Sequence, residues 1–295
     1  MEDELNEFQE YLDRIMFEQN NMGAPDLEGY SPYEMHQIIY APFGESSPLK
    51  LIDMQNSEYE LIPIFNQIKY LLSYIDSVGD LKLTQKGFLP TKVVENIFKQ
   101  KFVDEIAFCS SASKIYREAD YLSINLTRIL LEISGLTKKR YNKLSLTKVG
   151  KKVLANNQQL FQLIFEAFTM KFNWAYYDGY QDEQIGKTGF GFSLILLSKY
   201  GNKERLNNFY SQKYFQAFPI FEENLEYDDY RLDEKDLHRC YSVRTFDRFL
   251  IFFGLIKIRK GKDWLSDDYI TKTELFDKLI KCVPPSSIGR AGIFN

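Results

Sequence analysis

The stretch at residues 135–154, GLTKKRYNKLSLTKVGKKVL, constrains the fold of this chain more than any other. Leu136, Leu144 and Leu146 lie among polar neighbours, and Asn142 supplies a turn residue between two short runs. An amphipathic run precedes the stretch, and Thr147 opens another helical pattern. This order predicts a short β-hairpin, or wing, that leads from one helix into the next.

Two further segments, residues 81–98 and 254–280, carry a similar order of short strand, turn and helix. Repeats of one supersecondary unit indicate a modular chain. We therefore expect a mostly α chain with small β-hairpins (α+β), built from repeated winged-helix-like units. The three copies align at Leu83-Thr84, Leu146-Thr147 and Ile270-Thr271, so hairpins are expected near Leu83, near Leu146 and between Ile258 and Ile270.

Apolar spacing of three and four predicts several helices. Residues 2–20 are expected to form a surface helix, and Ser31-Pro32 with Glu34 is typical of a helix start. Two helices are expected to precede the second and third wings and to bury Leu130 and Phe249. Further boundary predictions are a helix over residues 61–75 ended by Gly79, a less regular helix over 102–120, a helix start at Ser242 and a capping box at residues 271–274.

Composition shifts and loop signals divide the chain into five segments. The linker is placed at residues 176–191, which are rich in glycine and aromatic residues. The expected segments are an N-terminal helical part (1–60), paired winged-helix-like units (61–175), the linker (176–191), a C-terminal helical region with the third unit (192–283) and a tail (284–295).

Charge and cysteine content limit the classes of function. The 41 acidic and 37 basic residues leave a net charge of −4, so any surface for nucleic acid must be local. Three widely spaced cysteines argue against a disulfide framework and for a reducing compartment. With no apolar run long enough for a membrane span and no leader pattern, we expect a cytoplasmic protein without membrane contact.

The segments LKLTQKGFLPTKVV and READYLSINLTRILLEISGLTKKRYNKLSLTKVGKKVL resemble a family of uncharacterised bacterial proteins, some of them plasmid-borne. Members carry consecutive winged-helix-like units with LT-x-x-G-x-LP and GL...LT-x-x-G signatures. The resemblance covers roughly residues 61–200 and continues more weakly to 280. Some relatives end in a cysteine-rich metal-binding tail, which this chain lacks. The resemblance implies an architecture and no activity.

The residues that most often carry chemistry form no recognisable site in the sequence. His36 and His238 stand far apart, outside any zinc pattern, and the pair of His238 and Cys240 lacks an orienting third group. Residues 186–189, GKTG, lack the leading glycine of a phosphate-binding loop, and the acidic run 222–236 lacks the spacing of a calcium loop. We expect no enzyme activity, no metal and no cofactor.

Two functions remain open. In the first, basic wings contact DNA phosphates, whereas the helix before the central wing offers base edges little beyond Asn125, Thr127 and Arg128. In the second, the chain is a non-catalytic scaffold for protein partners, and its lysines are simply solvated. The candidate nucleic-acid-binding residues are Lys138, Lys139, Arg140, Lys143, Lys148, Arg244, Arg248, Arg259, Lys260 and Lys262.

Overall fold

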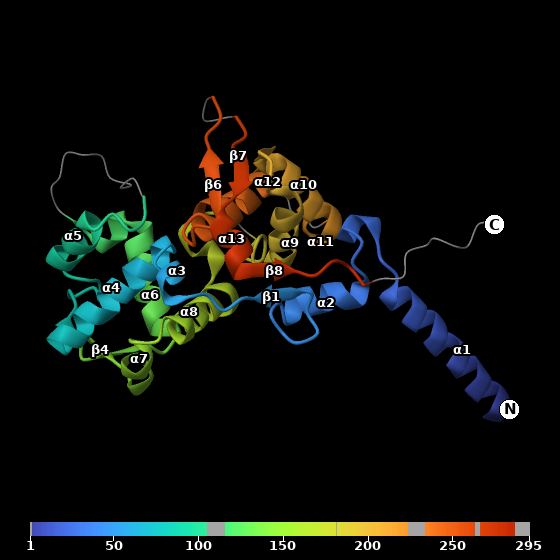
Figure 1. Cartoon of the computed structure of the whole chain (residues 1–295), viewed down its shortest axis with the longest axis horizontal. Helices are drawn as coiled ribbons and strands as arrows, with labels where there is room; N and C mark the ends of the chain where they lie inside the picture. Colours follow the sequence, from blue (N-terminus) through green and yellow to red (C-terminus); the bar gives the residue numbers. More distant parts are fainter. Residues whose placement is uncertain (1, 105–115, 181, 224–233, 263–265, 287–295) are drawn as a thin grey trace. The chain divides into compact units, whose positions relative to one another are not determined.

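The computed structural model of the chain describes residues 2–104, 116–180, 182–223, 234–262 and 266–286 (Figure 1). Helices dominate these residues, and their strands form small antiparallel sheets, which confirms the expected α+β class. The chain forms two compact units. Unit 1 comprises Met1–Ile52, Gln184–Thr245 and Ile256–Asn295, and unit 2 comprises Asp53–Glu183 and Phe246–Leu255.

Unit 2 contains a three-stranded sheet with the strand order β2-β4-β3. Its main elements are α3 (Asn56–Tyr59), α4 (Pro63–Val78), β2 (Asp80–Lys82), α5 (Thr91–Lys99), η2 (Glu118–Asp120), α6 (Leu122–Ile133), β3 (Thr137–Arg140), β4 (Lys143–Leu146), α7 (Lys148–Val153), α8 (Asn157–Glu166), the π-helix η3 (Ala167–Lys171) and η4 (Trp174–Tyr177). Leu81 of β2 lies opposite Leu144 of β4, and both are buried. The inner face of the sheet therefore belongs to the core.

Aromatic rings fill the rest of the core of unit 2. Phe165 packs against Phe249 and Phe253, with ring centroids 6.0 Å and 5.2 Å apart. Phe249 and Leu130 are both 0% exposed, which confirms the phase predicted for their helices. Burial of such large rings contributes strongly to the stability of a core.

Unit 1 holds a second three-stranded sheet, in the order β5-β7-β6, and the pair β1-β8. Its elements are α1 (Glu2–Asn21), η1 (Pro25–Leu27), α2 (Pro32–Tyr40), β1 (Leu49–Leu51), α9 (Phe190–Tyr200), β5 (Arg205–Leu206), α10 (Asn207–Ala217), α11 (Ile220–Glu223), α12 (Glu234–Ser242), β6 (Ile256–Arg259), β7 (Tyr269–Lys272), α13 (Glu274–Leu279) and β8 (Ile280–Cys282). The π-helix η6 (Val243–Leu250) follows α12 directly. Both three-stranded sheets place their first strand beside their last.

Local signals in the sequence set several helix ends as expected. Ser31 caps α2, because its hydroxyl accepts from the Glu34 amide while the Glu34 carboxylate accepts from the Ser31 amide. The same carboxylate accepts from Ser286 at 2.7 Å, which ties the described end of the chain to α2. Gly79, with φ of 76°, ends α4.

The expected hairpin near Leu83 does not form, and two predicted helix starts are also wrong. Strand β2 pairs with β4, about sixty positions later, so residues 81–98 contribute to the central wing's sheet. Ser242 does not start a helix, because α12 runs through it into η6. The predicted box at residues 271–274 is also wrong, since its first two residues belong to β7 and α13 begins at Glu274.

Parts of other predictions fall outside the described residues. These are positions 105–115 of the helix expected over 102–120, positions 224–233 of the acidic run and positions 287–295 of the tail. Among the residues described, no helix is long and apolar enough to cross a membrane.

Candidate nucleic-acid interface

The hairpin β3–β4 of unit 2 is closed by a tight turn at Tyr141 and Asn142. Their φ values are 48° and 57°, and two successive left-handed residues match the twist of a two-residue hairpin. The Asn142 amide Nδ2 donates to the carbonyls of Leu83 at 3.1 Å and Thr84 at 2.7 Å, and the Leu83 amide donates back to the Asn142 carbonyl at 2.9 Å. The tip is thereby fixed to the chain that leaves β2.

Three cations lie side by side on the outer face of this sheet. Lys143 in the central strand β4 is directly opposite Lys82 of β2 and Arg140 of β3. Opposite residues share a face, and the neighbouring Leu144 is fully buried, so this cation row of Lys82, Lys143 and Arg140 faces solvent. Like charges in opposite positions destabilise a sheet. The acid Asp80 lies 3.4 Å from Lys143, and both side chains are about half exposed.

Tyr141 at the hairpin tip is 99% exposed. A tyrosine in the left-handed region is strained, and full exposure gives its ring no packing role in the fold. Sequence reasoning missed this residue and Lys82. The signal for Tyr141 was present, as an aromatic residue next to the turn residue Asn142 and flanked by Arg140 and Lys143.

Further exposed cations continue from the wing into α7. Thr147 caps this helix by accepting from the Gly150 amide at 3.0 Å, and it donates to the Gly135 carbonyl at 2.8 Å. Gly150 packs directly under the Leu136 carbonyl, where a larger residue would collide. Within the described parts of the chain, no ion pair engages the exposed Lys138, Lys139, Lys148, Lys151 and Lys152.

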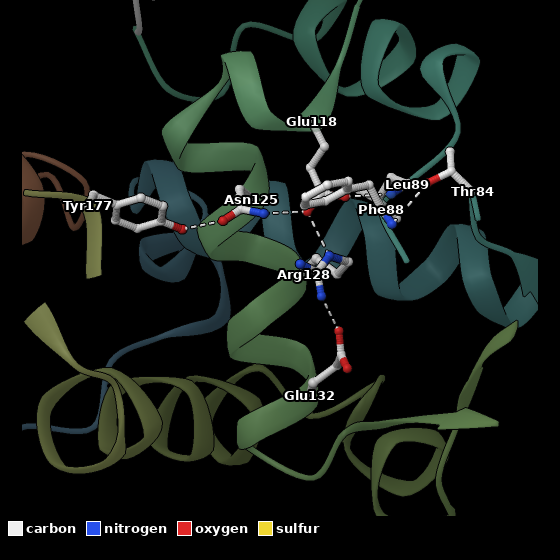
Figure 2. Close-up of polar contacts among 8 residues, drawn as sticks. All are labelled: Thr84, Phe88, Leu89, Glu118, Asn125, Arg128, Glu132 and Tyr177. Carbon is white, nitrogen blue, oxygen red and sulfur yellow. Dashed lines mark hydrogen bonds and ion pairs between the residues drawn. The ribbon is translucent and has the colours of Figure 1, made fainter. Parts of the chain in front are cut away.

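The helix α6, which precedes this wing, directs its polar side chains into the protein. Figure 2 shows Glu118 as their common acceptor. The Glu118 carboxylate, with a side chain 0% exposed, accepts from the Leu89 amide at 2.5 Å, from Asn125 Nδ2 at 2.5 Å and from Arg128 Nε at 2.6 Å. Arg128 also pairs with Glu132. Burial lowers the pKa of Arg128, but the two carboxylates more than offset this and raise it above its ordinary value.

Asn125 and Thr127 of α6 make further hydrogen bonds within unit 2. The Asn125 carbonyl oxygen accepts from the Tyr177 hydroxyl at 2.7 Å (Figure 2). Thr127 is 0% exposed, and its hydroxyl accepts from Gln67 Nε2 at 3.0 Å. Asn125, Thr127 and Arg128, the residues expected to meet base edges, therefore hold the fold of unit 2 together.

The wing cations of unit 1 lie in a different electrostatic setting. Arg259 makes a bidentate pair with Glu204, at 2.9 Å and 2.8 Å, and its guanidinium lies 3.8 Å from the centre of the Tyr269 ring. Lys260 pairs with Asp268 at 2.9 Å. Lys262 is exposed. The outer row that corresponds to the cation row is formed here by Leu206, Tyr269 and Arg259.

The two arginines expected on the helix before the third wing are internal groups. Arg244 is 1% exposed and donates to the Ile185 carbonyl at 3.1 Å. Arg248 belongs to unit 2, where it pairs with Asp178 at 3.1 Å and donates to the Tyr177 carbonyl at 3.2 Å. In this conformation neither guanidinium is presented to a phosphate.

The other chemistry-bearing residues have structural contacts. The His36 ring packs against Tyr40, and His238 Nδ1 lies 2.7 Å from the Ser211 hydroxyl. The loop at residues 186–189 is held by Tyr214, whose hydroxyl donates to the Thr188 carbonyl at 2.7 Å. No cluster of three or more His, Cys, Asp or Glu side chains suited to a metal occurs among the residues described.

Comparison with known protein families gives a match to part of the chain. A model of the Y4jL N-terminal domain, an uncharacterised family, matches residues 60–159. The matched segment is less than half of the chain, lies within unit 2 and includes the whole β2-β4-β3 sheet with its cation row. No curated protein and no solved structure matches the chain. The chain is thus similar, over this segment, to an uncharacterised family.

Proposed function

We propose that this protein binds nucleic acid through its phosphate backbone, using the outer face of the β2-β4-β3 sheet as the wing of a winged-helix unit. The connectivity supports this reading. The elements α4, β2, α5, α6, β3 and β4 follow in the order helix, strand, helix, helix, strand, strand, and the first strand pairs with the last. That order is the arrangement of winged-helix domains.

In this proposal, unit 1 contains a second winged-helix-like unit. Its elements α9, β5, α10, α12, β6 and β7 follow in the same order, with the short helix α11 inserted after α10 and the π-helix η6 after α12, and its sheet has the corresponding strand order β5-β7-β6. The chain then carries two winged-helix-like units, because the segment first interpreted as a third supplies β2 to the central one.

The observation that carries the proposal is the cation row. Lys82, Lys143 and Arg140 occupy directly opposite positions, where like charges repel. Asp80 offsets part of this repulsion at Lys143, but among the described residues no ion pair engages Lys82 or Arg140. A polyanion would convert the repulsion into attraction, and phosphates spaced along a backbone suit a row of separate cations.

The mode of binding in this proposal is contact with the backbone and not reading of bases. Recognition helices normally present several polar side chains to the major groove. In α6, those of Asn125 and Arg128 are committed to Glu118 and its partners. Binding is therefore expected to be weakly sequence-specific and strongly dependent on salt. The proposal assigns no catalytic step.

Tyr141 gives the wing a second type of contact. An exposed ring at the tip of a basic hairpin is suited to stack on an unpaired base or to enter a groove. Replacing Tyr141 by Ala should weaken binding to a single-stranded oligonucleotide by about 1–3 kcal/mol, the usual worth of one stacked base. Tyr141→Phe, which keeps the ring, is the matched control and should bind like the parent.

The main test is the salt dependence of binding. The variant K82Q/R140Q/K143Q is compared with the parent by fluorescence anisotropy on a random duplex at several salt concentrations. Each lost phosphate contact should reduce the slope of log affinity against log salt by about 0.9. Circular dichroism checks that the variant is folded.

The matched control removes the same charge from the other sheet. The variant K257Q/R259Q/K260Q changes two cations that are already paired, Arg259 and Lys260, together with exposed Lys257. Its slope should stay close to that of the parent. If the parent does not bind at low salt, or if the folded K82Q/R140Q/K143Q variant keeps the parent's slope, the proposal is wrong. Equal losses in both variants would indicate an effect of net charge alone.

A further inference from the structure

The helix α1 presents a continuous apolar face that no other described element covers fully. Leu5, Phe8, Tyr11 and Met16 are exposed by 65%, 59%, 50% and 58%. Large apolar side chains gathered on one side of a helix mark an interaction surface. The same helix is acidic on its other side.

The spacing of these residues fits a coiled-coil seam. Leu5, Phe8, Leu12 and Ile15 alternate by three and four positions, so they occupy the a and d sites of two heptads. Leu12 and Ile15 are partly covered and the first two are exposed. The seam is therefore fully open to a second helix at Leu5 and Phe8 and partly open at Leu12 and Ile15.

The residues beside the seam indicate which partner it fits. In a parallel, in-register pair, each g position faces the e position five residues later in the other helix. Glu4 would then face Gln9, and Tyr11 would face Met16, so no acid opposes an acid. An antiparallel pair would place Glu4 opposite Glu18.

We propose that α1 is a self-association element that forms a parallel two-helix coiled coil with α1 of a second copy of this chain. The acids Glu7, Glu10 and Asp13 lie at outer positions of the heptads, where they stay in water. Pairing would remove the exposed Leu5 and Phe8 side chains from water, which favours association. This inference is independent of the proposed nucleic-acid binding.

Sedimentation equilibrium of the full chain at several concentrations tests the association. The parent should show a reversible monomer–dimer equilibrium. Phe8→Asp, at a d site, should weaken association at least about tenfold, which corresponds to about 1.4 kcal/mol. Phe17→Asp is the matched control, because Phe17 is 69% exposed at an outer position, and it should associate like the parent.

Disulfide trapping tests the parallel register. In a parallel pair, d sites face each other, so Phe8→Cys should form a disulfide-linked dimer under mild oxidation and Phe17→Cys should not. The parent chain sets the background. Burial raises the pKa of the Cys282 thiol to about 11, and Cys240 is buried, so both are poor competitors. The third cysteine, Cys109, lies outside the described residues and is replaced by Ser in all the proteins compared.

Three results would overturn the inference. A parent chain that stays monomeric at all concentrations would mean that the seam serves another partner. Association that survives Phe8→Asp would place the contact elsewhere. A dimer whose Phe8→Cys variant forms no disulfide would exclude the parallel register.

Discussion

The two three-stranded sheets share their connectivity and differ in the charged side chains that they expose to solvent. The cation row of the unit 2 sheet is Lys82, Lys143 and Arg140, whereas the corresponding row of the unit 1 sheet contains one cation, Arg259. That arginine is neutralised by Glu204 and stacked on Tyr269. The single cation of the unit 1 row is therefore held by partners within its own unit. In the unit 2 row, the ion pairs of the described residues include only Lys143 with Asp80, and this difference supports the proposed interface.

Each unit also engages an arginine of the helix that precedes its hairpin in an internal contact. Arg128 of α6, with a side chain 11% exposed, pairs with the carboxylate of Glu118, whereas Arg244 of η6 is 1% exposed and donates to the Ile185 carbonyl. Substitutions in the cores and on the outer rows of the two sheets test the comparison separately.

The largest effect is expected in the cores. Phe249 in unit 2 and Phe276 in unit 1 are both 0% exposed, so truncation to Ala should lower the free energy of unfolding by about 3–5 kcal/mol in each case. Urea unfolding measures the loss, and hydrogen exchange locates it in the mutated unit. Melting within a degree of the parent would mean that the helix phase assigned to that residue is wrong.

The next effect concerns the buried acceptor Glu118. Replacing it by Ala leaves Arg128 without its most buried partner and should lower stability by about 3 kcal/mol. Glu95→Ala, which removes an exposed pair with Lys99, should cause no measurable change in urea unfolding. Equal effects of the two substitutions would contradict the structural role given to Glu118.

A pH-dependent effect is expected in unit 1 from Glu28. Burial raises the pKa of Glu28, but hydrogen bonds from Lys199, Lys213 and Tyr200 more than offset this and leave it below its ordinary value. A carboxylate with a lowered pKa in the folded state stabilises the fold above its unfolded pKa, and this contribution is lost as pH falls through the folded pKa. Stability should therefore fall below about pH 4.5, the ordinary value.

Glu28→Gln serves as the control for this effect. The variant should be less stable than the parent at neutral pH, and the gap should narrow in acid as the parent's carboxylate takes up its proton. Urea unfolding at several pH values measures the gap. A gap of constant size would exclude Glu28 as the titrating group.

The smallest effect is expected from reversing the charge of one arginine in each outer row. Arg140→Glu places an acid opposite Lys143 and should stabilise unit 2 by about 0.5 kcal/mol while it weakens nucleic-acid binding. Arg259→Glu at the corresponding position of unit 1 faces Glu204 and should destabilise. Urea unfolding measures the change in the free energy of unfolding for each variant. Changes of the same sign would contradict the proposed difference between the two sheets.

Local features of the fold could be predicted from the sequence. The cap at Ser31 and the stop at Gly79 depend on neighbouring residues only, and both were predicted. The pairing of β2 with β4 could not be predicted, because nothing within residues 80–82 specifies a partner about sixty positions away. The helix start predicted at Ser242 was wrong, because a serine that follows a polar run also fits inside a continuing helix.

The candidate interface could be predicted only where it depends on residues that are neighbours in the sequence. The exposed cations of residues 138–143 follow from composition and hairpin spacing, and they were identified. The contribution of Lys82 requires the strand register, and the burial of Arg244 requires its tertiary surroundings. Whether a cation is neutralised depends on distant acids such as Glu204, 55 positions from Arg259, which a linear pattern does not specify.

The anchored tip of the β3–β4 hairpin has a consequence for the time course of the proposed binding. Asn142 holds the turn to the chain at Leu83 and Thr84 by three hydrogen bonds, so the wing is already ordered before any ligand arrives. A preordered loop loses little entropy on binding and requires no slow closing step. Association should therefore follow a single exponential whose rate rises linearly with ligand concentration, and Asn142→Ala should introduce a second, slower phase.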